Sequence, residues 1–140
     1  MDNERYMGHL NLCEIDLPGQ QALASARVLI VGAGGLGSPV ALYLASAGVG
    51  TIGVADADTV GISNLQRQIM HGTPDIGTPK TESARRAMTR VNPDVVVLTH
   101  DMMVDASNIE PLLEGYDVVA DCCDNFPTRL LISDTCARLG

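Results

Sequence analysis

The sequence predicts an α/β fold built on a doubly wound, mostly parallel sheet with helices on both faces. Short, continuous apolar runs alternate with helical patterns along residues 27–140, and such runs are typical of parallel strands that are buried on both faces. A glycine-rich turn, Gly32-Ala33-Gly34-Gly35-Leu36-Gly37, joins the first apolar run to the first helical pattern. This strand–turn–helix unit is typical of Rossmann-like domains.

Local signals predict the bounds of the elements. Gly48 ends the first helix, Thr78 is expected to be the N-cap of the second helix with Pro79 at its first position, and Asn92-Pro93 ends that helix. A polar lead-in with a short helical stretch near residues 20–24 comes first. The expected strands are 28–31, 51–55, 95–98 and 118–120, and the expected helices are about 36–47, 78–91, 108–113 and 126–140.

The order of the strands follows from the handedness of their connections. Right-handed crossovers give the order 3-2-1-4 and leave a ligand crevice beyond the carboxyl ends of strands one, two and four. Gly34, Asp56 and residues 121–124 are expected at that crevice.

Composition narrows the classes of function. The 140 residues suit one domain, and their 46% apolar content can build a core. Seventeen acidic residues against nine basic ones give a net charge of −8, which argues against a nucleic-acid partner. No apolar run is long enough to span a membrane and no signal-peptide pattern is present, so we expect a cytoplasmic protein without a membrane partner.

Cysteine and histidine give no local metal-binding pattern. No two cysteines form a C-x-x-C pair, and Cys122 and Cys123 are expected to be buried as small apolar residues. His9, His71 and His100 are scattered and are expected on the surface or in loops rather than as metal ligands.

The glycine turn predicts a nucleotide site. Its glycines bring backbone N–H groups close to a phosphate at a helix N-terminus, and Asp56 follows Gly37 by 19 residues, where an acid for a ribose hydroxyl is expected. The motif does not say which nucleotide binds. The predicted contacts of this part are Gly32, Gly34, Gly35, Gly37 and Asp56.

Residues 58–77 form an unusually long connection, and such connections are often functional. Arg67 can bind phosphate oxygens bidentately, while Asn64 and Gln66 supply amide donors. Lys80 stands in the first turn of a helix, where the macrodipole disfavours a cation. It is expected to reach a phosphate in the crevice; the alternative is a surface lysine.

Asp121-Cys122-Cys123-Asp124-Asn125 follows the fourth strand. Carboxylates at that edge suit Mg²⁺ bound with substrate phosphates. The alternative is helix capping by Asp124 or Asn125.

These motifs together resemble the ThiF/MoeB/HesA family, the bacterial relatives of ubiquitin-activating enzymes. The matching segments cover nearly the whole chain and are Arg27–Pro39, Leu65-Gln66-Arg67-Gln68, Gly77-Thr78-Pro79-Lys80 and Asp121–Asn125 with Arg129.

The resemblance implies binding of ATP and Mg²⁺ and adenylation of the C-terminal glycine of a ubiquitin-like sulfur-carrier protein, as in thiamine or molybdopterin sulfur transfer. It implies that Arg67, Lys80 and Asp124 are catalytic and that Asp124 serves Mg²⁺. The implied nucleotide contacts are the turn glycines with Asp56, Asn64, Arg67, Lys80, Asp124 and Asn125.

Two departures from the family bear on activity. The family's N-terminal pattern R-Y-x-R-Q/H reads Arg5-Tyr6-Met7-Gly8-His9 here, so Gly8 replaces an arginine that in the family reaches the partner's ATP across a homodimer. Family members are also longer. We therefore expect residues 1–26 to be a dimer-contact segment, residues 27–140 to be the nucleotide-binding domain, and the carrier-docking surface and zinc site to belong to an absent C-terminal part.

Two other functions remain open on the sequence. The glycine turn and Asp56 also fit an NAD(P)-dependent oxidoreductase domain, and Gly8 also fits a catalytically impaired nucleotide-binding or dimerisation module. Arg67, Lys80 and Asp124 favour ATP over NAD(P), because a dinucleotide needs no triphosphate clamp.

Overall fold

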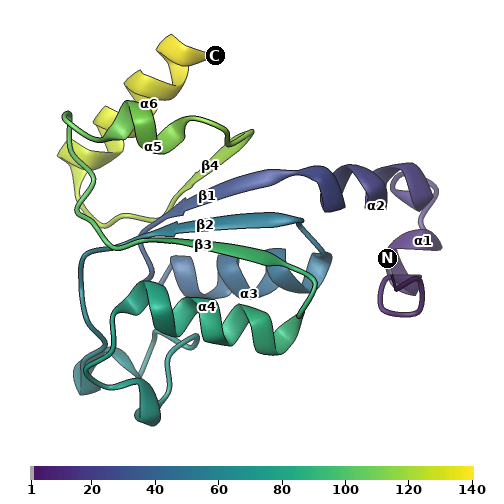
Figure 1. Cartoon of the computed structure of the whole chain (residues 1–140), viewed down its shortest axis with the longest axis horizontal. Coiled ribbons are helices and arrows are strands. Elements are labelled where there is room, and N and C mark those ends of the chain that lie inside the picture. Colours follow the sequence, from purple (N-terminus) through teal and green to yellow (C-terminus); the bar gives the residue numbers. More distant parts are fainter. Residues whose placement is uncertain (1) are drawn as a thin grey trace.

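A parallel sheet of four strands forms the centre of the computed structural model, which describes residues 2–140 (Figure 1). The strand order is β3-β2-β1-β4, so the predicted order 3-2-1-4 is confirmed. The strands are β1 (Arg27–Val31), β2 (Thr51–Ala55), β3 (Val96–His100) and β4 (Val118–Asp121). The helices are α1 (Met7–Leu10), α2 (Asp16–Ser25), α3 (Gly37–Ala47), α4 (Lys80–Val91), α5 (Ile109–Leu113) and α6 (Phe126–Leu139), with 3-10 turns η1 (Ile62–Asn64) and η2 (Thr73–Asp75).

Helices cover both faces of the sheet, as the sequence predicts. α3 and α4 lie on one face and α5 and α6 on the other, beside β4 (Figure 1). Successive residues of β1 point to opposite faces, so Ile30 joins the core under α3 and α4 while Leu29 joins the core under α5 and α6. Both side chains are fully buried, and this explains the continuous apolar run.

The start of α4 differs from the prediction. The helix begins at Lys80 with Pro79 as its N-cap, and the Thr78 hydroxyl donates to the carbonyl of Asp75 instead of capping the helix. The reason is tertiary: Thr59 and Pro79 form an isolated antiparallel bridge, and Val60 N–H donates to the carbonyl of Thr78 at 2.8 Å. Residues 77–79 therefore bond to the preceding connection instead of starting the helix.

The lead-in is more ordered than the sequence predicts, since it forms α1 and α2. Tyr6 is buried, and its hydroxyl oxygen accepts from Asn92 Nδ2 at 2.7 Å. Gln20 is fully buried, and its Nε2 donates to the carbonyl of Ala47 at 2.9 Å. Both contacts fix the lead-in at the C-terminal ends of α3 and α4, at the amino end of the sheet (Figure 1).

No helix within residues 2–140 is long and apolar enough to cross a membrane.

Gly37 is required for the close packing of α3 on β1. A Cβ at this position would lie 1.9 Å from the carbonyl oxygen of Gly32, and backbone cannot yield cheaply. We expect Gly37→Ala to lower the free energy of unfolding by about 1–3 kcal/mol, measured by thermal denaturation followed by circular dichroism. Gly72→Ala is the control, because its new Cβ would be 3.5 Å from the nearest atom, an ordinary contact. A Gly37→Ala protein as stable as the wild type would contradict this packing.

Candidate functional site

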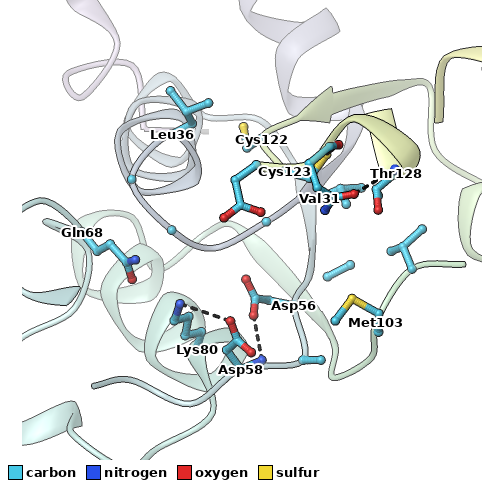
Figure 2. A pocket seen from close by; sticks show the side chains of 18 of the residues that line it. Val31, Leu36, Asp56, Asp58, Gln68, Lys80, Met103, Cys122, Cys123 and Thr128 are labelled. Carbon is cyan, nitrogen blue, oxygen red and sulfur yellow. Dashed lines mark hydrogen bonds and ion pairs between the residues drawn. The ribbon is translucent and has the colours of Figure 1, made fainter. Parts of the chain in front are cut away.

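A cavity of about 540 Å³ opens at the carboxyl ends of β1, β2 and β4, where the sequence predicts the crevice (Figure 2). Most of the predicted site residues meet there. Those that line it are Gly32, Gly34, Gly35, Asp56, Arg67, Lys80, Asp124 and Asn125. Gly37 and Asn64 are not among the residues that line it, because Gly37 packs under the turn and Asn64 bonds to its own loop.

The glycines of the turn have two different physical roles. Gly32 has φ +102°, and a Cβ there would lie 2.6 Å from the carbonyl oxygen of Cys122, so this position supports the fold. A Cβ on Gly34 would instead be 3.5 Å from Gln68 Nε2, and one on Gly35 would be 3.9 Å from the Arg67 side chain. Gly34 and Gly35 therefore leave open space at the cavity rather than avoid a clash.

Asp56 holds the glycine turn against the end of β2. Its Oδ2 accepts from Ala33 N–H at 2.8 Å, and its Oδ1 accepts from Asp58 N–H at 2.8 Å. Each carboxylate oxygen keeps a lone pair that a ligand hydroxyl can use. The prediction that Asp56 binds a ribose thus remains compatible with its contacts.

Lys80 places a buried cation at the cavity. The residue is 6% exposed, and its Nζ lies 3.6 Å from Oδ2 of the exposed Asp58 (Figure 2). The alternative of a surface lysine is wrong. Because burial of a charge is unfavourable without a partner, an anionic ligand would be stabilised beside Lys80.

The long connection contributes two polar side chains to the cavity, Arg67 and Gln68. Arg67 lines the cavity, and its Nη1 donates to the carbonyl of Ser63 at 3.2 Å. Asn64 Oδ1 accepts from Gly61 N–H at 2.9 Å and closes the turn at η1. Sequence reasoning missed Gln68: it lines the cavity, is 4% exposed, and its Oε1 has no hydrogen-bond partner within residues 2–140.

Hydrogen bonds hold the loop between β4 and α6 in place. Asp121 Oδ1 accepts from Cys123 N–H at 3.1 Å, and Asn125 Oδ1 accepts from Thr128 N–H at 3.0 Å as the N-cap of α6. The capping alternative therefore holds for Asn125. Arg129 fixes the loop, since its Nε and Nη2 donate to the carbonyl of Cys123 at 3.1 and 2.7 Å.

Asp124 is the exposed carboxylate that this loop presents to the cavity. Within residues 2–140 no group of three His, Cys, Asp or Glu residues could hold a metal ion by itself. One carboxylate is compatible with Mg²⁺, which usually binds one or two carboxylates together with waters and substrate phosphates.

His71 lies in a loop, as the sequence predicts, but it is buried under the glycine turn rather than exposed. Its Nε2 lies 2.8 Å from the carbonyl oxygen of Ala33, and its Nδ1 lies 2.7 Å from Ser83 Oγ. His100 is half-buried beside Tyr116, and burial lowers its pKa. His9 contacts Gln20.

The surroundings of the adjacent cysteines disfavour their thiolate forms. Burial raises the pKa of the half-buried Cys122 thiol, and the Asp121 carboxylate raises it further. Burial also raises the pKa of Cys123, whose Sγ donates to Asp121 Oδ1 at 2.8 Å. Neither cysteine is therefore placed as an activated nucleophile at the cavity.

Residues 6–140 match the ThiF family. The chain belongs to this family. The resemblance that the motifs indicate is thereby confirmed.

Similar proteins carry adenylyltransferase or activating-enzyme names. The chain is 50% identical over 137 residues to the SAMP-activating enzyme E1 of Haloferax volcanii, covering 98% of this chain and 51% of that protein. It is 48% identical over 136 residues to adenylyltransferase and sulfurtransferase MOCS3 of Mus musculus, covering 97% of this chain and 30% of that protein. The chain therefore spans between 30% and 51% of the length of these relatives.

A solved structure supports the fold at lower identity. The E. coli tRNA N6-threonylcarbamoyladenosine dehydratase TcdA, in complex with ATP, superposes with a TM-score of 0.90 and is 30% identical. The match covers 97% of this chain and 56% of that chain.

The raised pKa values of the Cys122 and Cys123 thiols predict slow alkylation. At pH 7.5 a thiol whose pKa is raised holds less thiolate, so Cys122 and Cys123 should react with iodoacetamide more slowly than the exposed Cys13. Their alkylation rates should rise at a higher pH than the rate of a thiol with an ordinary pKa. Mass spectrometry of peptides after timed alkylation measures each site, and equal rates at Cys122 and Cys13 would contradict the assignment.

Proposed function

We propose that this protein binds ATP with Mg²⁺ in the cavity and adenylates the C-terminal glycine of a ubiquitin-like sulfur-carrier protein, with release of pyrophosphate. The observation that carries the proposal is that the buried Lys80 and the exposed Asp124 line one cavity together with the glycine turn. The names of the adenylyltransferase relatives and the ATP complex of TcdA support it.

The lining of the cavity suggests one orientation of the nucleotide. The N–H groups of Gly34 and Gly35, with Lys80 and Arg67, would hold the phosphates. Asp56 would accept from a ribose hydroxyl. The base would lie against the apolar wall made by Met102, Met103 and Val104.

Asp124 would hold Mg²⁺ together with phosphate oxygens. Asp121 and Asp56 are less suited to this role, because their carboxylates already accept hydrogen bonds from the protein. When bound, Mg²⁺ supplies neutralisation of the charge on the phosphates.

The proposed reaction needs no nucleophile or proton acceptor from this chain. A carboxylate oxygen of the carrier forms a bond to the α-phosphorus, the bond from that phosphorus to the bridging oxygen breaks, and pyrophosphate leaves with the electron pair. Lys80 and Arg67 would orient the triphosphate and offset its charge, so catalysis rests on positioning and electrostatics.

The lead-in would act only on another copy. Gly8 lies in α1 at the amino end of the sheet, whereas the cavity lies at the carboxyl end. A side chain at position 8 therefore reaches no part of its own cavity. We propose a homodimer in which residues 1–26 approach the partner, with Gly8 leaving the partner's phosphates without one cation.

Nucleotide preference tests the proposal against the oxidoreductase alternative. We expect ATP with Mg²⁺ to bind at least about tenfold more tightly than NADH, because Lys80 and Arg67 can both contact a triphosphate. Isothermal titration calorimetry on the 140-residue chain measures both affinities, and EDTA should weaken ATP binding. Tighter binding of NADH would reject the proposal.

Gly34 offers a test that separates binding from folding. Its new Cβ in Gly34→Ala would make only ordinary contacts, so the melting temperature should stay near that of the wild type. The methyl group would fill space at the phosphates, and ATP affinity should fall about tenfold. Gly72→Ala, whose Cβ also makes ordinary contacts, is the matched control and should bind ATP normally. Normal ATP affinity of Gly34→Ala would place the phosphates elsewhere.

A further inference from the structure

The peptide bonds on either side of Ala33 are held from the interior of the protein. Ala33 is fully buried, its N–H donates to Asp56 Oδ2 at 2.8 Å, and its carbonyl oxygen lies 2.8 Å from His71 Nε2. His71 is 5% exposed and does not line the cavity. It therefore acts on the glycine turn from behind.

The contacts of His71 define its tautomer. A carbonyl oxygen only accepts, so Nε2 carries the proton and donates it to Ala33. In the neutral ring, Nδ1 then accepts from the hydroxyl of Ser83, 2.7 Å away. Ser83 is 1% exposed and lies one turn after Lys80 on α4, so His71 connects the glycine turn with the helix that carries the buried cation.

Planarity transmits this contact to the cavity. The carbonyl of Ala33 and the N–H of Gly34 belong to one planar trans peptide and point in opposite directions. When His71 draws the carbonyl inward, the N–H of Gly34 is turned the other way, toward the cavity that Gly34 lines. No hydrogen bond within residues 2–140 uses that N–H.

We propose that His71 is a positioning residue for nucleotide binding: by holding the Ala33 carbonyl and Ser83, it aims the Gly34 N–H at a phosphate and sets the glycine turn relative to Lys80. This inference rests on the proposed function. It assigns no contact between His71 and the nucleotide.

A pair of substitutions separates the two contacts of the ring. The amide of His71→Gln can reach the position of Nε2 and keep the bond to Ala33, while His71→Asn can reach the position of Nδ1 and keep the bond to Ser83. Both variants lose one buried hydrogen bond, so both should melt at a lower temperature than the wild type. Only His71→Asn should lose the orientation of the Gly34 peptide.

The measurements are the melting temperature and the dissociation constants of ATP with Mg²⁺ and of adenosine, the latter by NMR titration. We expect His71→Gln to bind ATP within about twofold of the wild type and His71→Asn to bind it about tenfold more weakly. Adenosine affinity should be unchanged in both, because adenosine has no phosphate for Gly34 to bind. A purely structural role predicts instead that ATP and adenosine affinities fall together with the melting temperature.

Equal ATP affinities of the two variants, or parallel losses for ATP and adenosine, would overturn the positioning role while leaving the proposed function intact. A wild-type chain that binds no ATP would overturn both. If His71→Asn does not fold, His71→Leu takes its place, because its apolar side chain gives the Ala33 carbonyl no donor. An ATP affinity about tenfold weaker than that of His71→Gln with unchanged adenosine affinity then supports the role, and an ATP affinity equal to that of His71→Gln overturns it.

Discussion

The close approach of α3 to the end of β1 is the constraint on which the site depends. A hydrogen atom is all that fits at Gly37, because a Cβ would lie 1.9 Å from the carbonyl oxygen of Gly32. The chain can therefore pass from strand to helix within six residues. That short turn puts Gly34 and Gly35 at the carboxyl edge of the sheet, with their backbone facing the cavity.

Two cations lie at the cavity of a protein whose net charge is negative. The protein carries a net charge of −8, yet Lys80 is buried and Arg67 lies at the same cavity. The exposed Asp58 is the carboxylate nearest to Lys80, at 3.6 Å. Asp58 is exposed and its 3.6 Å contact with Lys80 is long for an ion pair, so a phosphate can replace Asp58 as the partner of the buried Lys80. This exchange is the physical basis of the proposed preference for a triphosphate.

Much of the fold and part of the site follow from local sequence signals. Continuous apolar runs and right-handed crossovers predict the strand order, and breaking the macrodipole rule singles out Lys80. The remaining features depend on contacts between distant residues: His71 meets Ala33 across 38 positions, Tyr6 meets Asn92 across 86, and residues 77–79 pair with the connection rather than starting α4. Gln68 is another such case, because η1 folds the connection so that this amide lines the cavity while Asn64 bonds to its own loop. No local pattern encodes these pairings.

Backbone amide chemical shifts test the central claim, that the glycine turn holds the phosphates of ATP. In ¹⁵N-labelled protein, ATP with Mg²⁺ should shift the amide signals of Gly34 and Gly35 strongly, whereas adenosine should shift only those near Met102, Met103 and Val104. Shifts at Gly34 and Gly35 that are equally large with adenosine, or absent with saturating ATP, would contradict the account.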